Sequence, residues 1–159
     1  MNDAELRTYD IVLFGATGFT GGLTAEYLAQ HAPKELRWAI AGRSASKLEA
    51  IKQRLVALDA HAASVGVIEA QLDDDASLQR MAAQTRVLLS TVGPFVDYGE
   101  PVVRACIAAG TDYVDSSGEL QFLELLWARY AIPASERGVR LVPSCGFDAI
   151  PADLGAFFT

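Results

Sequence analysis

Short apolar runs alternate along this chain with longer stretches in which apolar residues recur at helical spacing. Residues 11–14 and 87–89 are continuously apolar, which is typical of strands buried on both faces of a parallel sheet. The pattern predicts six strands, over residues 10–14, 37–41, 65–70, 86–91, 113–115 and 139–143. It predicts helices over residues 19–30, 47–58, 76–84, 100–109 and 120–130, and a last helix from about residue 151. This alternation indicates an α/β domain with a doubly wound parallel sheet, the Rossmann fold, over residues 1–159.

Polar residues and glycines mark the expected ends of several helices. Ser46 with Glu49, and Ser116 with Glu119, have the spacing of a capping box, in which serine and glutamate satisfy free N–H groups at a helix start. Gly110 and Gly138 follow predicted helices where a left-handed residue is common. Residues 153–159 include large apolar residues, read as a helix in mid-course and carry no stop signal. We therefore expect an N-terminal domain of a longer protein.

Composition narrows the classes of partner. The chain has a formal net charge of −7, which argues against nucleic-acid binding and means that any anionic ligand is held by local groups. The N-terminal residues are polar, and no apolar run is long enough to cross a bilayer, so we expect a cytoplasmic protein without a membrane segment. Its two cysteines, Cys106 and Cys145, are too few for a disulfide framework and are not spaced as a metal site.

The most informative motif is a glycine loop, G-x-x-G-x-x-G, over residues 15–21. It follows the first predicted strand and opens the first predicted helix. A strand, a tight glycine turn and a helix N-terminus together present free N–H groups and a partial positive charge to a phosphate. This context predicts a dinucleotide site rather than an ordinary glycine turn. Its expected cofactor contacts are Gly15, Thr17, Gly18, Phe19, Thr20 and Gly21.

The end of the second strand predicts which dinucleotide binds. NAD sites usually carry an acidic residue there for the ribose 2′-OH, whereas NADP sites carry an arginine nearby. Here Arg43 follows the strand and no acid does, which favours NADP. Ser44 and Lys47 are close enough in sequence to add a hydroxyl and a positive charge. The alternative is a solvated arginine beside a helix start.

Two further strand ends are expected to reach the same crevice. Asp73 follows the third strand and is predicted to contact the adenine, although an acid there suits a helix N-cap equally well. After the fourth strand, Gly93 permits a close backbone approach to the ribose or nicotinamide. The contacts expected from this turn are Thr91, Val92, Gly93 and Pro94.

The ends of the fifth and sixth predicted strands carry acidic residues and a cysteine. Asp115, Glu119, Cys145 and Asp148 are candidates for substrate or proton handling, whereas capping accounts for Glu119 and Asp148 about as well. No tyrosine has a lysine four residues later, so the Tyr-x-x-x-Lys mechanism of short-chain dehydrogenases does not apply. No catalytic residue is assigned.

Taken together, these segments resemble the NADP-binding N-terminal domain of the saccharopine dehydrogenase family, over nearly the whole chain. The resembling residues are 15–21, 41–44, 47–48, 91–95, 98–99, 113–115, 118–119 and 145–155. The last segment looks like the branch that contains trans-acting enoyl reductases and saccharopine-dehydrogenase-like proteins. The resemblance implies NADP as cofactor and a second domain that completes the substrate site and could support a homodimer.

The expected activity is hydride transfer from NADPH to an activated double bond or imine, with a small or carrier-bound acyl substrate in the enoyl reductase case. Two alternatives stay open. One is a protein that binds NADP without turnover, as a sensor or scaffold. The other is a semialdehyde dehydrogenase with Cys145 as its nucleophile.

Overall fold

The computed structural model describes residues 7–159, which form one α/β domain. Its strands are β1 (Tyr9–Phe14), β2 (Trp38–Gly42), β3 (Gly66–Glu69), β4 (Thr85–Ser90), β5 (Asp112–Asp115) and β6 (Leu141–Val142). Its α-helices are α1 (Phe19–His31), α2 (Ala45–Leu58), α3 (Asp75–Ala82), α4 (Phe95–Ala109), α5 (Leu120–Glu136) and α6 (Ile150–Phe157). A short 3₁₀ helix, η2 (Ala60–Ser64), precedes β3.

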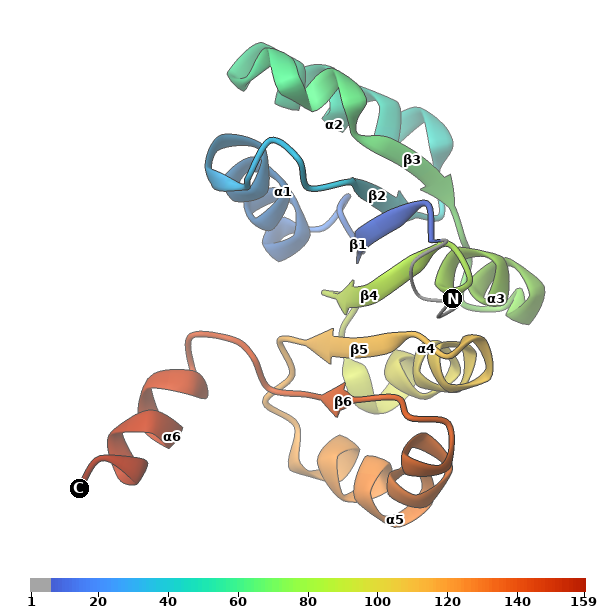
Figure 1. Cartoon of the computed structure of the whole chain (residues 1–159), viewed down its shortest axis with the longest axis vertical. Coiled ribbons are helices and arrows are strands. Elements are labelled where there is room, and N and C mark those ends of the chain that lie inside the picture. Colours follow the sequence, from blue (N-terminus) through green and yellow to red (C-terminus); the bar gives the residue numbers. More distant parts are fainter. Residues whose placement is uncertain (1–6) are drawn as a thin grey trace.

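The sheet has the strand order β3-β2-β1-β4-β5-β6, and every neighbouring pair is parallel (Figure 1). The order reverses direction between β1 and β4, as it does in a doubly wound Rossmann sheet. The predicted fold class is therefore confirmed.

Helices cover both faces of the sheet, and successive apolar residues of a strand pack against opposite faces. Leu13 and Ile40 lie in one buried cluster with residues of α1 and α2. Val12 and Leu88 lie in the other, with residues of α3, α4 and α5. Because both faces are covered, the central strands contain apolar residues at consecutive positions, which is the pattern seen in the sequence.

Several helix starts differ from the predicted ones. Ser44, not Ser46, is the N-cap of α2, and its hydroxyl accepts a hydrogen bond from the Lys47 N–H at 3.5 Å. Ser116 does not cap α5, whose N-cap is Glu119 without a side-chain cap bond. Both predicted capping boxes are therefore wrong. Local spacing suggested them, but Ser44 caps α2 and the Glu119 carboxylate accepts from the start of α4.

Helix α4 begins five residues before its predicted start. Its first-turn N–H groups, of Phe95 and Val96, donate to the two carboxylate oxygens of Glu119 at 2.7 and 2.8 Å. A partner 23 or 24 positions away thus stabilises this helix start, which a local pattern does not reveal. The helix-ending glycines are confirmed, with φ of 69° at Gly110 and 65° at Gly138.

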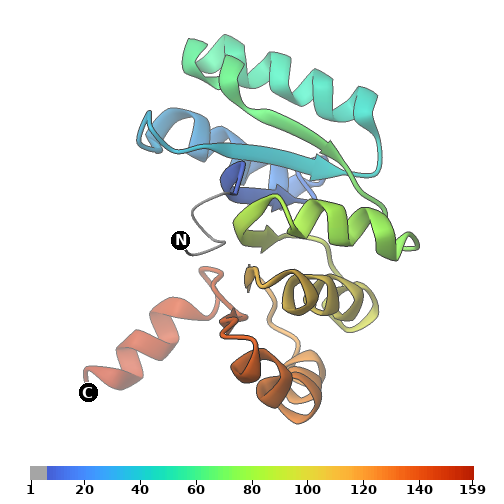
Figure 2. The ribbon, with the colours of Figure 1, turned by 45° about the vertical axis from the view of Figure 1, so that its right-hand side comes forward.

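Helix α6 projects away from the sheet beyond β6 (Figures 1 and 2), and none of its residues is buried. Phe157 and Phe158 are 80% and 79% exposed. Within residues 7–159, no helix combines the length and apolar character that a membrane crossing requires. The same residues contain no group of three or more histidine, cysteine or acidic side chains that could hold a metal ion.

Candidate functional site

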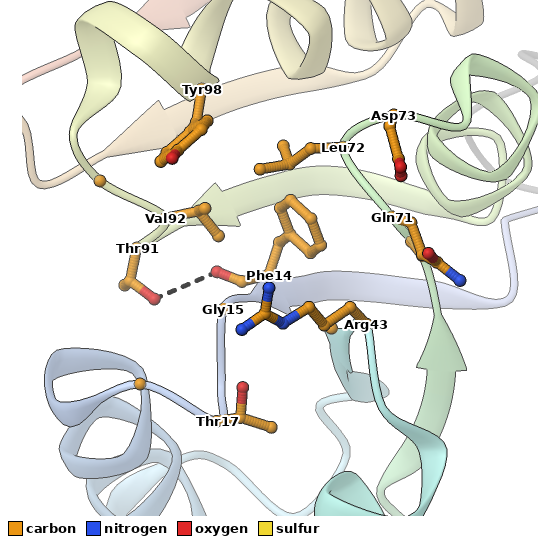
Figure 3. A pocket seen from close by; sticks show the side chains of 14 residues that line it. Phe14, Gly15, Thr17, Arg43, Gln71, Leu72, Asp73, Thr91, Val92 and Tyr98 are labelled. Atoms are coloured by element: carbon orange, nitrogen blue, oxygen red, sulfur yellow. Dashed lines mark hydrogen bonds between the residues drawn. The ribbon is translucent and has the colours of Figure 1, made fainter.

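A cavity of about 550 Å³ opens at the carboxyl ends of β1, β2, β3 and β4 (Figure 3). This is the point where the strand order reverses, and open α/β sheets bind ligands there. Thr91 joins the two central strand ends, because its N–H and its hydroxyl both donate to the Phe14 carbonyl, at 2.9 and 3.1 Å. These two hydrogen bonds hold together two of the strand ends that line the cavity.

The glycine loop forms one wall, and two of its glycines are sterically required. Gly15 has φ of +95°, and a Cβ there would lie 2.8 Å from both Thr91 Oγ1 and Val92 Cγ2. A Cβ on Gly21 would collide with the Gly15 carbonyl and would lie 2.8 Å from Thr91 Oγ1. Gly18 is less restricted, with the Gly15 carbonyl oxygen 3.3 Å from its built Cβ. The loop thus brings α1 close against the ends of β1 and β4.

Helix α1 starts without a side-chain cap. Its N-cap is Gly18, in an extended conformation, so the first-turn N–H groups of Phe19, Thr20 and Gly21 have no intrahelical acceptor. The starts of α2 and α3 are instead held by side chains of Ser44 and Asp74. An uncapped helix start beside a glycine loop suits a phosphate group, which accepts from these N–H groups and interacts favourably with the helix dipole.

Arg43 extends from the end of β2 into the cavity, toward the glycine loop (Figure 3). Its side chain takes part in none of the ion pairs formed among residues 7–159. The guanidinium fork is therefore available for an anionic ligand, and its geometry matches a phosphate. No acidic residue of β2 competes for it.

The sequence left open whether Asp73, after β3, contacts a ligand or caps a helix, and the structure separates these roles between two aspartates. Asp74 caps α3, since its carboxylate accepts from the Ser77 N–H at 3.0 Å. Asp73 makes no such cap and lies on the wall of the cavity with Gln71 and Leu72. The capping role therefore belongs to Asp74, and Asp73 is free to face a ligand.

The structure brings together on this cavity many of the residues that the sequence predicted as cofactor contacts. Those that line it are Gly15, Thr17, Gly18, Arg43, Asp73, Thr91, Val92 and Gly93. The other predicted contacts do not line the cavity, although each lies within four positions of a lining residue in the chain: Phe19, Thr20, Gly21, Ser44, Lys47 and Pro94.

Some lining residues were not predicted from the sequence. They are Phe14, Gly42, Ala70, Gln71, Leu72 and Tyr98. The first five flank predicted strand ends, so extending each strand end by a few residues would have found them. Tyr98 reaches the cavity from the first turn of α4 (Figure 3). It was missed because that helix was predicted to begin only at residue 100.

At the carboxyl end of β5, the Asp115 side chain holds the loops that follow β5 and β6. Asp115 is 2% exposed, and its Oδ1 accepts from the N–H groups of Ser117 and Ser144, each at 2.9 Å. These bonds tie the loop after β5 to the loop after β6. Glu119 caps α4, as described above, and Asp148 is not the N-cap of α6, which is Ala149.

The two cysteines are free thiols with different surroundings. Cys106 is buried in the core, and this burial raises the pKa of its thiol. Cys145 is exposed and lies outside the cavity lining. Burial of its sulfur, and then the Asp115 carboxylate, raise the pKa of the Cys145 thiol. A nucleophilic cysteine usually has a lowered pKa, so this environment does not favour the semialdehyde dehydrogenase mechanism.

Comparisons with known proteins agree with this geometry. Residues 11–139 match the family model described as the saccharopine dehydrogenase NADP binding domain. The saccharopine dehydrogenase-like oxidoreductase of Mus musculus is 44% identical over 163 residues, which cover 98% of this chain and 38% of the relative. A trans-acting enoyl reductase of Mycobacterium bovis is 45% identical over 157 residues, covering 99% of this chain and 36% of the relative.

This chain thus spans less than two-fifths of the length of these relatives. Among solved structures, apo saccharopine dehydrogenase (L-Glu forming) from Saccharomyces cerevisiae superposes with a TM-score of 0.70 at 21% identity. The match covers 89% of this chain and 28% of that protein. At this identity the superposition supports the fold alone.

Proposed function

Because the chain belongs to the family of saccharopine dehydrogenase NADP-binding domains, we propose that it is the cofactor-binding part of an oxidoreductase. The proposed reaction is hydride transfer from NADPH to an activated double bond or imine. The observation that carries the proposal is the cavity lined by the uncapped start of α1 and by Arg43, which forms no ion pair within residues 7–159. Both features provide donors for phosphate oxygens, and NADP has a pyrophosphate and a 2′-phosphate to accept them.

Each part of the cavity suits one part of the cofactor. The first-turn N–H groups of α1 would hold the pyrophosphate, and Arg43 would pair with the 2′-phosphate, with Ser44 and Lys47 adding donors from the start of α2. Asp73 would accept from the adenine amino group. Residues 91–94 would lie against the ribose or nicotinamide, where Gly93 gives the backbone a close approach.

When bound, NADPH supplies the hydride, and the protein contributes orientation and electrostatics. Thr91 performs part of this positioning, because its two bonds to Phe14 keep the ends of β1 and β4 at a constant separation. Glu119 keeps the first turn of α4 in place, and with it the Tyr98 side chain that faces the cavity. No residue of this chain is assigned as the catalytic acid.

The relative named trans-acting enoyl reductase suggests the substrate class. We propose an α,β-unsaturated acyl chain, free or held on a carrier. Most of the length of the relatives lies outside the matched region, so the parts that contact the substrate, and any homodimer contact, are proposed to lie there. Location in the cytoplasm remains a prediction from the sequence.

The proposal is tested in two steps. Fluorescence titration of the chain with NADPH and with NADH should show tighter binding of NADPH, because only NADPH carries the 2′-phosphate. Hydride transfer is then measured as loss of NADPH absorbance when the longer protein is mixed with enoyl thioesters or imines. Binding of NADPH without oxidation by either substrate class would favour the NADP sensor instead.

A further inference from the structure

A second cavity, of about 680 Å³, lies at the opposite edge of the sheet, beside the amino ends of β1, β4 and β5. We call it the amino-edge cavity. Its charged lining consists of four arginines and two aspartates: Arg7, Asp10, Arg86, Asp112, Arg137 and Arg140. A formal excess of two positive charges in one cavity stands out in a chain whose net charge is −7.

Part of this positive charge has a structural role. The Arg7 guanidinium donates to the carbonyl oxygens of Ala82, Ala83 and Ala109, at 3.4, 2.5 and 2.5 Å. These carbonyls belong to the ends of α3 and α4, where a cation interacts favourably with the helix dipole. Arg7 is therefore committed to the fold.

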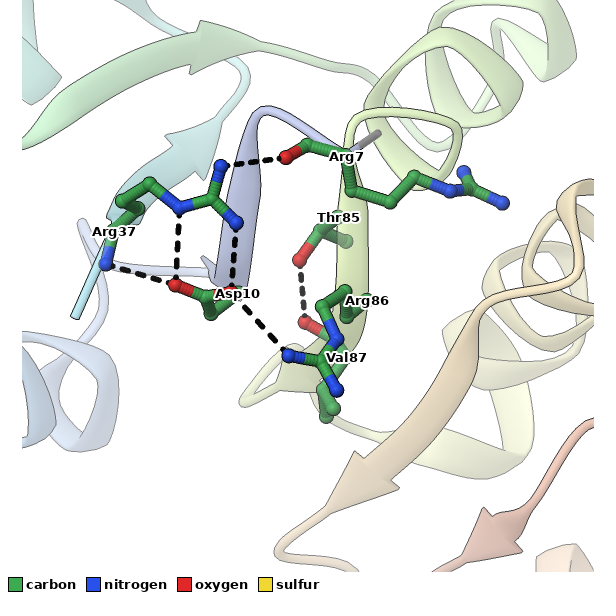
Figure 4. A network of polar contacts seen from close by, with 6 residues as sticks. All are labelled: Arg7, Asp10, Arg37, Thr85, Arg86 and Val87. Atoms are coloured by element: carbon green, nitrogen blue, oxygen red, sulfur yellow. Dashed lines mark hydrogen bonds and ion pairs between the residues drawn. The ribbon is translucent and has the colours of Figure 1, made fainter. Parts of the chain in front are cut away.

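The Asp10 carboxylate is hydrogen-bonded to Arg37, which does not line the cavity. Arg37 donates to it through Nη2 at 2.9 Å, through Nε at 3.3 Å and through the backbone N–H at 3.1 Å (Figure 4). These bonds lower the pKa of Asp10, so it is charged near neutral pH. Arg86 approaches the same carboxylate only to 3.6 Å, too far for a hydrogen bond (Figure 4).

The second carboxylate, Asp112, is held in the same way by Arg140. It accepts from the Arg140 backbone N–H at 2.8 Å and from Nε at 2.9 Å. Although burial opposes ionisation, the Arg140 hydrogen bonds lower the pKa of Asp112. Arg137 takes part in none of the ion pairs within residues 7–159. The guanidinium groups of Arg86 and Arg137 therefore have N–H donors that form no hydrogen bond with a described side chain.

We propose that the amino-edge cavity binds a small phosphate-bearing anion through the guanidinium groups of Arg86 and Arg137. A guanidinium presents a planar fork of donors that matches two phosphate oxygens. The cavity volume lies in the range of small-molecule sites. A nucleic acid is a poorer match, because the acidic surface of the chain repels a long polyanion. This site is distinct from the cofactor cavity, which opens at the other edge of the sheet.

The test is a calorimetric titration of the chain with inorganic pyrophosphate at an ionic strength of about 0.15 M, where the Debye length is about 8 Å. The double variant Arg86→Gln/Arg137→Gln removes the proposed donors. The matched control, Arg104→Gln/Arg129→Gln, removes two exposed arginines elsewhere, on α4 and α5. A second titration in the presence of saturating NADPH, which occupies the cofactor cavity in the proposed function, excludes pyrophosphate bound there. Circular dichroism establishes that each variant is folded.

We expect saturable binding that the Arg86→Gln/Arg137→Gln variant weakens by about tenfold or more, since two charge-assisted contacts are lost. The control should change affinity by less than about twofold, because distant exposed charges are screened. An equal loss in both double variants would overturn the proposal, since general electrostatics would then explain the binding. So would the absence of saturable binding, binding that saturating NADPH abolishes, or binding that the Arg86→Gln/Arg137→Gln variant leaves unchanged.

Discussion

Replacing Arg43 with alanine probes the cofactor cavity at the position that we propose distinguishes NADPH from NADH. Arg43 faces the cavity and forms no ion pair among the described residues, so the substitution should leave the stability of the domain nearly unchanged. What it removes is the fork of donors proposed for the 2′-phosphate. The expected effect is therefore on binding of NADPH and not on folding.

The size of the effect follows from the charge of both partners. A hydrogen bond to a charged group contributes about 1.5–3 kcal/mol, and about 1.4 kcal/mol corresponds to a tenfold change in affinity. The Kd for NADPH should therefore rise by roughly 10- to 100-fold, toward the lower end at physiological salt because Arg43 is exposed. The Kd for NADH should change by less than about twofold, because NADH has no 2′-phosphate.

The assay is titration of wild type, Arg43→Ala and a control, Arg129→Ala, with each dinucleotide, followed by NADPH or NADH fluorescence. Arg129 carries the same charge on an exposed face of α5, away from the cavity. The control should bind both dinucleotides like wild type. Equal affinity of the wild type for NADPH and NADH, or an equal loss of both in Arg43→Ala, would refute the role assigned to Arg43.

Three other predictions test contacts that stabilise the fold. Gly21→Ala should lower both the melting temperature and NADPH affinity, because its Cβ meets the Gly15 carbonyl; unchanged values of both would contradict the close packing of α1. Glu119→Ala should reduce the free energy of unfolding, measured with urea, by about 1–3 kcal/mol, since it leaves two first-turn N–H groups of α4 without their acceptor. Hydrogen bonds from Arg37 lower the pKa of Asp10. Their stabilisation is therefore complete above the unfolded pKa of about 4 and is lost as the pH falls through the lower folded pKa. Urea unfolding from pH 7 to pH 3 should show this loss in wild type and a smaller one in Asp10→Asn, and equal slopes would exclude it.

The candidate site was predictable where its residues depend on local sequence. Gly15 and Arg43 each follow a strand directly, so a strand pattern and one residue type were enough to predict them on the cavity. Tyr98 was not predictable in this way, because the start of α4 depends on Glu119, which is far away in sequence. The two acids Asp73 and Asp74 are chemically identical, and only the position of the Ser77 N–H assigns the cap to one of them.

The sequence by itself determined the alternation of strands and helices, the parallel sheet and the presence of a glycine loop between β1 and α1. These features arise from short-range patterns, namely buried apolar runs, helical periodicity and glycines at a strand-to-helix turn. Only the tertiary structure decided which donors and acceptors meet. The placement of β4 beside β1 brings Thr91 to Phe14 and to Gly15. A buried or helix-terminal polar group pairs with whatever partner the fold brings within about 3 Å, and that partner is often remote in the chain.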